Sequence, residues 1–471
     1  MKLRHALALA SSSLPLATLG GCGLTPHDES TPVFSSDGVT GFGMVGNVEF
    51  CIGRTRVVAP AVAAGAELAL CVPDGATPRA CEADLDCAPR ERCSCGRCVV
   101  VACDTTGRGC AEGEVCQGGR CTTACTRDGE CARDFVCRGG GCVHECATST
   151  DCAYGELCDS LASTCRVSLC GGARGGCGSG QTCEPLEHVA EMREPFVLGS
   201  GAGERAYLTV AAGGTTVIYR ARPARDLRWV ADPETPVLEP GPASDLGSVG
   251  APALLAERGG LTLYFETGGG TIERATSSDG VSFTRDAAPV LVATPDGWEA
   301  GRVGSPSVIV YRGETYLFYA GGAGAGIGAA RVGASGVTRL TGAPLVSRAT
   351  VEDPLFWRGV SAVGAPSAMV VEGAVRIFFT ARGAEGHDAI EQGSPRAADV
   401  NDSIGLVTTR DFVSFERYPM GPVFARRTNL RAYLGEREPF LRRDGARTRL
   451  YFVTGDATGK ASGVALAADP P

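Results

Sequence analysis

The sequence predicts an all-β chain, with a five-bladed β-propeller preceded by a small disulfide-rich repeat region. Three observations lead there: a proline motif that recurs five times, a block of cysteines ahead of it, and abundant glycine (66) with few aromatic residues (6%). Recurrence of this kind indicates repeat units that bury a core between neighbours. At 471 residues the chain is longer than one core usually supports, so we expect two or more domains.

The first residues are typical of an export signal, with Lys2 and Arg4 ahead of an apolar stretch. The stretch ends in Leu-Gly-Gly-Cys, which resembles the cleavage box of bacterial lipoproteins. That resemblance implies lipidation of Cys22 and an outer-membrane lipoprotein of the cell envelope, facing the periplasm or the surface. The alternative is a plain secretory signal with a chance cysteine. We expect a signal peptide over 1–22 and a flexible tether over 23–40.

All other cysteines lie between Cys51 and Cys183, where an exported segment favours disulfides. They recur in groups of four that resemble Dickkopf-type cysteine-rich repeats and span 81–183. The first group carries an additional Cys95, and the last lacks its fourth member. A zinc site at Cys95 and Cys98 is the competing interpretation, because their spacing suits metal ligands. Such repeats are usually spacers or binding modules, so a protein partner is possible here.

Cys51 and Cys71 remain outside these groups. We expect them to close a small β element over 41–80. The cysteine-rich groups contain too little apolar sequence for a core of their own, so covalent bridges must hold them.

The segment 190–471 repeats a proline motif followed by short apolar strands separated by glycine-rich turns, which indicates four-stranded blades. The motif prolines are Pro195, Pro252, Pro306, Pro366 and Pro439. The fifth repeat stops after its third strand. We expect the missing strand from residues 187–190 or from the segment near 42–50, because closing the ring hides a sheet edge.

This repeat resembles the five-bladed propellers of glycoside hydrolase family 43, the related fructosidase clan and the mannoside phosphorylases. The resemblance implies carboxylates that point into a central funnel, since glycoside hydrolysis uses an acid and a base. Glu194 occupies the first-blade acidic position, whereas Ala251 and Ser305 stand where further acids are expected. Glu438 and Glu299 are the other candidate catalytic acids.

Further side chains near these positions are candidates for binding a substrate. They are Arg193, Arg437, Trp298, Trp357 and Asp353. Asp388 and Asp402, in the long fourth-blade insertion, are acids that could take the place of the missing catalytic carboxylates. Each has a structural alternative. The arginines can pair with neighbouring glutamates, the tryptophans can fill gaps between blades, and the insertion can be a solvated loop.

Several function classes are not supported. The net charge of -9 offers no basic surface for nucleic acid. The five histidines do not cluster, and no glycine-rich loop ends in lysine ahead of a helix. We expect no cofactor. The resemblance allows a calcium ion at the propeller centre, but no residue set points to one.

These observations lead to three hypotheses. The first is a surface-anchored lipoprotein whose propeller binds carbohydrate with weak or no catalysis, attached to the membrane through its N-terminal lipid. The second is an active inverting glycoside hydrolase. The third is a structural or adhesive surface protein that binds protein partners. Fold resemblance does not decide among them, because function resides in the site.

Overall fold

The computed structural model confirms the all-β class: its only α-helix is the four-residue α1 (Arg348–Val351) among the residues that it describes. Within these residues no helix is long and apolar enough to cross a membrane. The described residues are 30–32, 43–58, 69–87, 91–100, 113–117, 120–133, 135–152, 154, 156–170, 176–185, 187–224, 227–333, 336–352, 357–358, 360–382, 385–386, 402–418, 423–426, 436–444, 447–455 and 461–468.

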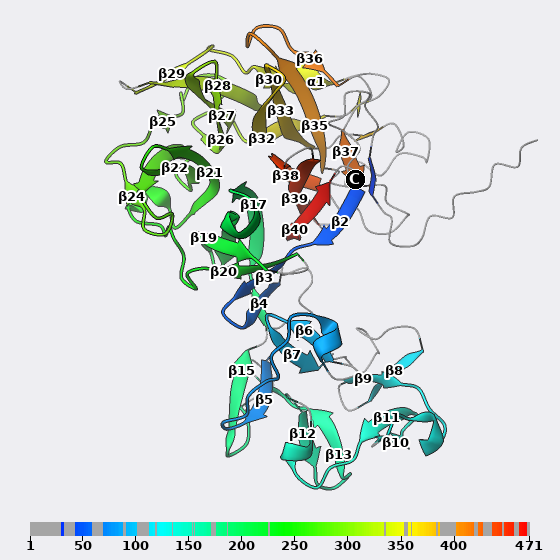
Figure 1. Ribbon diagram of the computed structural model, residues 1–471. Helices are drawn as coiled ribbons and strands as arrows, with labels where there is room; N and C mark the ends of the chain where they lie inside the picture. The colour runs from blue at the N-terminus through cyan, green and yellow to red at the C-terminus, as the bar shows by residue number, and fades with distance from the viewer. Residues whose placement is uncertain are drawn as a thin grey trace, which may run out of the picture.

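Within the described residues, the innermost strands of five sheets line one channel. Figure 1 shows how these sheets are arranged. Their innermost strands are β17 (Glu191–Leu198), β21 (Val249–Glu257), β26 (Val303–Tyr311), β32 (Ala362–Val371) and β38 (Glu436–Asp444). The second strands are β18 (Arg205–Ala212), β22 (Gly260–Thr267), β27 (Glu314–Gly321), β33 (Ala374–Arg382) and β39 (Arg447–Gly455). The third strands are β19 (Thr215–Pro223), β23 (Thr271–Ser277), β28 (Gly326–Gly333), β35 (Asp402–Thr409) and β40 (Ala461–Ala468).

Short strands lie outside the third strands, and in the first and fourth sheets further strands from the N-terminal part of the chain pair with them. These short strands are β20 (Arg228–Ala231), β24 (Thr284–Arg285), β25 (Leu291–Val292), β29 (Gly336–Arg339), β30 (Val346–Ser347), β36 (Glu416–Arg417), β37 (Phe424–Arg426) and β1 (Ser30–Pro32). A separate two-stranded ladder joins β31 (Trp357–Arg358) to β34 (Glu385–Gly386).

The ring closes between the last sheet and the first. The innermost strands contact one another in cyclic order, with β38 beside β17. The last sheet obtains its fourth strand from the N-terminal part of the chain, because β2 (Gly43–Asn47) pairs antiparallel with β40 (Figure 1). This is the second of the two sources expected from the sequence. The other, β16 (Glu187–Val189), pairs in parallel with β4 (Thr55–Val58).

Apolar side chains form one cluster between each pair of neighbouring sheets. Successive residues of a strand point to opposite faces, so a blade supplies two clusters at once. In β18, Tyr207 packs towards the second sheet and Leu208 towards the last. This explains why the second strands read as continuous apolar runs: both of their faces are buried.

The cysteine-rich region, residues 69–185, consists of small hairpins held by disulfides. The hairpins are β6–β7 (Glu91–Ser94, Arg97–Val100), β8–β9 (Glu114–Gln117, Arg120–Thr123), β10–β11 (Phe135–Arg138, Gly141–His144) and β12–β13 (Glu156–Asp159, Thr164–Val167). In a fully described group the first cysteine bonds to the third and the second to the fourth, as in Cys125–Cys137 and Cys131–Cys142.

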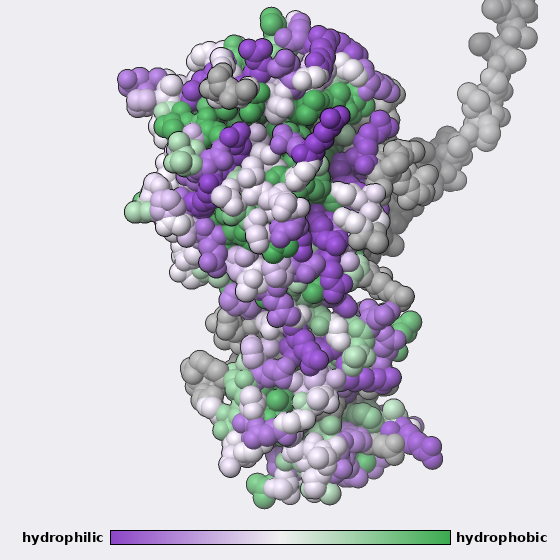
Figure 2. All heavy atoms as spheres, turned by 60° about the vertical axis from the view of Figure 1, so that its left-hand side comes forward, coloured by the Kyte–Doolittle hydropathy of each residue, from purple (hydrophilic) through white to green (hydrophobic). Residues whose placement is uncertain are grey.

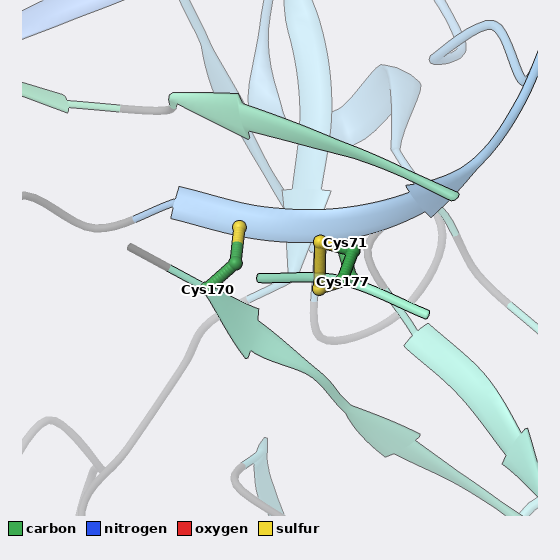
Figure 3. A group of neighbouring side chains, drawn as sticks. All are labelled: Cys71, Cys170 and Cys177. Carbon is green, nitrogen blue, oxygen red and sulfur yellow. A yellow bond between two sulfur atoms is a disulfide. The ribbon is translucent and has the colours of Figure 1, made fainter. Parts of the chain in front are cut away.

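The cysteines outside the groups pair differently from our expectation. Cys51 bonds to Cys95, and Cys71 bonds to Cys177, as Figure 3 shows beside Cys170. The expected closure of Cys51 by Cys71 is therefore wrong. These pairings also exclude zinc at Cys95 and Cys98, since the thiol of Cys98 bonds to Cys87.

The interval 41–80 is accordingly not one element but four strands that join three different sheets, with β2 in the last propeller sheet. β3 (Glu49–Ile52) and β4 extend the first propeller sheet, next to β20. β5 (Ala69–Pro73) instead pairs with β14 (Leu169–Cys170) and β15 (Gln181–Pro185) in the cysteine-rich region. β3 and β4 pair with each other as a local hairpin, whereas Cys71 of β5 bonds to a cysteine 106 residues away in sequence.

Candidate functional site

Each innermost strand carries the same irregularity where it faces the channel. The residue before each motif proline has a left-handed backbone, with φ between 46° and 55°, and the pairing register shifts there. These five bulge residues are Glu194, Ala251, Ser305, Ala365 and Glu438. A non-glycine residue in this conformation costs about 1–3 kcal/mol, so the surrounding ring must stabilise it.

The stabilising contacts come from the neighbouring blade. Most of the bulge N–H groups donate to a side chain of the preceding sheet. The Ala251 N–H donates to Thr209 Oγ1 (2.9 Å) and to Glu194 Oε2 (2.7 Å), and the Glu438 N–H donates to Thr380 Oγ1 (2.8 Å). The proline motif thus marks the positions where a ring of hydrogen bonds joins neighbouring blades.

Three carboxyl groups gather at this ring. Glu194 Oε2 accepts from the Thr209 hydroxyl (2.7 Å), and Glu438 Oε2 accepts from the Glu194 N–H (3.1 Å). The third is Glu266 at the end of β22, whose Oε2 accepts from the Ser305 N–H (2.7 Å). The cluster therefore draws on the first, second and fifth blades.

Burial in this ring changes how the carboxyl groups titrate. Desolvation and the neighbouring Glu266 raise the pKa of Glu194 to about 7. Desolvation and Glu194 likewise raise the pKa of Glu438 to about 7. Desolvation also raises the pKa of Glu266. Like charges confined in a low dielectric cannot all ionise together, so part of the cluster retains protons near neutral pH.

A cavity of about 340 Å³ opens beside this ring, between the third and fourth blades. Glycine and alanine form much of its wall, which leaves the space unfilled. Its small wall residues are Gly304, Ala320, Gly321, Ala323, Gly324, Ala362, Gly364 and Ala365, and its polar ones are Glu266, Arg302, Ser305, Thr380, Arg382, Arg437 and Glu438. Its size lies at the lower end of typical ligand pockets.

Arginines and acids alternate around the cavity. Arg437 is buried, with Nε 3.5 Å from Glu438 Oε1 and Nη1 3.6 Å from Asp402 Oδ2. Asp402 also accepts from Arg382 Nε (3.1 Å). Arg302 approaches Glu266 at 3.9 Å. The structure thus brings together the predicted residues Glu194, Glu438 and Arg437. Asp402, also a candidate from the sequence, is buried beside them and pairs with Arg437 and Arg382.

Glu299 is not part of this cluster. Its side chain is fully buried and accepts hydrogen bonds from Tyr319 (2.8 Å), Arg339 and Thr294, and it lines neither the channel nor the cavity. Burial alone would raise the pKa of Glu299, but the hydrogen bonds outweigh it and lower the pKa to about 2. A permanently charged, fully bonded carboxylate joins blades and is unsuited to proton transfer, so the expected catalytic role is not supported.

Trp298 has a packing role too. Its ring stacks on Tyr319 (centroids 5.8 Å apart) within the cluster between the second and third blades, outside the cavity lining. Arg193 pairs with Glu191 and lines neither the channel nor the cavity. Trp357 begins β31, where only its backbone pairing is described. The expected sites Asp353 and Cys22, and Asp388 of the insertion, lie outside the described residues.

Glu266 was missed from the sequence because the search for acids followed the proline motif on the innermost strands. Its place on β22 is opposite Gly250, equivalent to Thr209, Ala320, Thr380 and Val453 in the other blades. One available signal was its polarity at the end of an apolar strand, next to Phe265. Recognising that signal requires the alignment of each second strand with its innermost strand, which only the sheet register provides.

No protein-family model matches the chain, and no curated protein sequence matches it. Similar solved structures include a thermostable family-43 glycoside hydrolase (14% identity, 59% of this chain and 88% of that chain, TM-score 0.44). Others are a family 130 mannoside phosphorylase relative (14%, 60% and 88%, 0.44) and a glycosyl hydrolase from Bacteroides ovatus (15%, 59% and 84%, 0.43). At these identities and TM-scores the likeness assigns neither family nor activity.

Proposed function

We propose that the cavity beside the channel binds carbohydrate, with Glu266, Glu438 and Thr380 as hydrogen-bonding partners of sugar hydroxyls. The observation that supports this is the combination of a small-residue wall with a dense set of polar groups. Sugars present many hydroxyls, which such groups satisfy in either direction. Among the described residues no aromatic side chain lines this cavity, so recognition here depends on hydrogen bonds and charge rather than ring stacking.

The binding test is a glycan array probed with the full chain and with a Thr380→Val variant. Thr380 holds the Glu438 N–H, so the variant removes one hydroxyl from the wall with little change of volume. We expect weaker binding to the same glycans, and Thr448→Val, a buried threonine of β39 outside the cavity, serves as control. Absence of any glycan binding by the unaltered protein would refute the proposal.

Hydrolysis is the second candidate function, favoured by the raised pKa of Glu438. A carboxyl that keeps its proton near pH 7 can act as general acid, and Glu266 lines the same cavity as the possible base. The sequence predicted Glu194 with either Glu299 or Glu438 in these two roles, so Glu266 is the new member of the pair. Hydrolysis that falls above about pH 7 and disappears in Glu438→Gln and Glu266→Gln supports an enzyme; binding without turnover supports a binding protein.

We also propose that the chain is a lipoprotein of the bacterial envelope, attached through Cys22, and that the cysteine-rich region offers a surface to a protein partner. The N-terminal signal pattern supports the first and the resemblance to Dickkopf-type repeats supports the second. Mass spectrometry of the mature N-terminus tests the lipid. A Cys22→Ser variant that remains membrane-bound would contradict it.

A further inference from the structure

The ring of bulge N–H groups is incomplete at one position, and the cavity lies there. In the first four sheets, the second-strand residue paired with the residue before the bulge is the potential acceptor for the next blade. Thr209, Glu266 and Thr380 fulfil this role. In the fifth sheet Val453 stands at this position, and Glu438 Oε2 accepts the Glu194 N–H instead. Ala320 occupies the same place in the third blade and has only a methyl group, so it offers no acceptor to the Ala365 N–H.

The two residues at the break also line the cavity. By the geometry of the other bulges, the Ala365 N–H is directed at the Ala320 position. Gly364 opens the space further: a Cβ there would lie 3.6 Å from the Ala320 Cβ, an ordinary contact. The Ala365 N–H therefore faces the cavity without a side-chain acceptor, because Ala320 has no polar group. A ligand atom that accepts from this N–H would complete the ring of hydrogen bonds between blades.

Two guanidinium groups line the same cavity as this donor. The side chains of Arg302 and Arg382 are 55% and 54% exposed, enough to meet a ligand from solvent. Arg382 uses its Nε for Asp402, and the structure shows no bond from its two terminal nitrogens to a described residue. Arg302 has its nearest carboxylate at 3.9 Å, beyond hydrogen-bond distance. Both therefore retain donors that fit a planar carboxylate.

We propose that this corner of the cavity is a subsite for the carboxylate of an acidic sugar, bound by the Ala365 N–H, Arg302 and Arg382. The inference rests on the proposed carbohydrate binding and narrows it to glycans that contain uronic acids. The raised pKa values of Glu266 and Glu438 are consistent with it, because protonated carboxyls repel a bound anion less than ionised ones.

The ligand test compares trigalacturonate with its methyl ester, which keeps the sugars and removes the charge. Isothermal titration of the full chain at low salt should show about tenfold tighter binding of the acid, as expected for guanidinium–carboxylate bonds. The preference should shrink with added salt. Equal affinity for acid and ester overturns the subsite but leaves carbohydrate binding intact. Failure to bind either ligand overturns the subsite, and the glycan array then shows whether carbohydrate binding fails with it.

The protein test replaces the missing acceptor. An Ala320→Thr variant places at this position the residue that Thr209 and Thr380 already supply in equivalent surroundings, so the fold should tolerate it. We expect the preference for the acid to be lost, because the new hydroxyl accepts the Ala365 N–H and fills the corner. Arg382→Gln should lower the preference also, whereas Arg331→Gln, exposed on the same third sheet, should not. Unchanged preference in both Ala320→Thr and Arg382→Gln would overturn the inference.

Inorganic phosphate provides the remaining comparison. If free phosphate competes with trigalacturonate at millimolar concentration, the subsite recognises an oxyanion in general. If it does not compete, the subsite requires the carboxylate as part of a sugar. Competition that persists in Ala320→Thr places the anion elsewhere and counts against the proposal.

Discussion

The cysteine-rich region and the propeller solve the same problem of stability by different means. In the described part of the cysteine-rich region, the hairpins have four-residue strands, and the largest apolar cluster contains only Leu70, Val72, Val99 and Val100 as buried members. Disulfides hold it. The propeller has no cysteine after Cys183 and relies on five apolar clusters between blades. Covalent bonds replace burial where the units are too short to exclude water.

A disulfide and several polar contacts join the cysteine-rich region to the propeller. The Cys51–Cys95 disulfide connects β3 of the first sheet to the β6–β7 hairpin. Beside it, Arg228 binds Glu49 Oε2 (2.6 Å) and the Cys93 carbonyl (3.0 Å). Figure 2 shows the two parts as a larger and a smaller body joined through a narrower waist. The strand that closes the propeller and the strand that anchors the cysteine-rich region thus come from one N-terminal segment.

Reducing the disulfides should produce the largest difference in stability between the cysteine-rich region and the propeller. Each native disulfide of a small domain contributes about 2–5 kcal/mol, so complete reduction should unfold the cysteine-rich region while the propeller keeps its structure. Hydrogen exchange with and without reductant measures this. Loss of protection in β22 and β33 on reduction would show that the propeller depends on the disulfides.

The next largest effect is expected from removing a side chain between blades. Phe265 is fully buried in the cluster between the first and second sheets, so Phe265→Ala should cost about 3–5 kcal/mol. Urea unfolding of the reduced protein isolates the propeller contribution. Val310→Ala, at a half-exposed position of β26, should change stability little; equal losses in the two variants would contradict the assignment of the core.

Glu299→Gln tests a polar connection of the propeller. Removing the charge weakens the bonds from Arg339 and Tyr319, and we expect a loss of about 1.5–3 kcal/mol. Because the native pKa is lowered to about 2, this contribution is present above the ordinary value of 4.5 and is lost as the pH falls towards 2. Glycan binding should be unchanged. Weaker glycan binding by a stably folded Glu299→Gln variant would show that Glu299 contributes to the site.

The smallest effect concerns Glu194. Its native pKa of about 7 exceeds the ordinary 4.5, so the native state binds more protons than the unfolded chain between these values. Stability should therefore fall as the pH rises from about 4.5 to 7. Glu194→Gln keeps an oxygen for Thr209 and Ala251 and removes the charge, so we expect a gain on the order of 1 kcal/mol at pH 8 and none at pH 4. Melting temperatures at both pH values measure it; a loss at pH 8 would contradict the expectation.

Local patterns predicted much of the fold. The alternating apolar strands, the recurrent proline and the groups of four cysteines have short-range signatures, and the structure confirms the all-β propeller and the disulfide-rich region. The site was predicted in part. Glu194 and Glu438 share a motif that marks the innermost strands, but the motif does not reveal which second-strand residue lies opposite. Glu266 became visible only through the register of β21 and β22.

The sequence by itself determined which segments form strands, which cysteines form repeat groups and where the proline motif recurs, because each depends on neighbours a few residues away. Only the tertiary structure decided the partners of Cys51 and Cys71, the role of β2 in closing the ring and the burial of Glu299. It also placed Ala320 in the wall of the cavity. These outcomes depend on contacts between residues distant in the chain, and the packing of whole blades selects them.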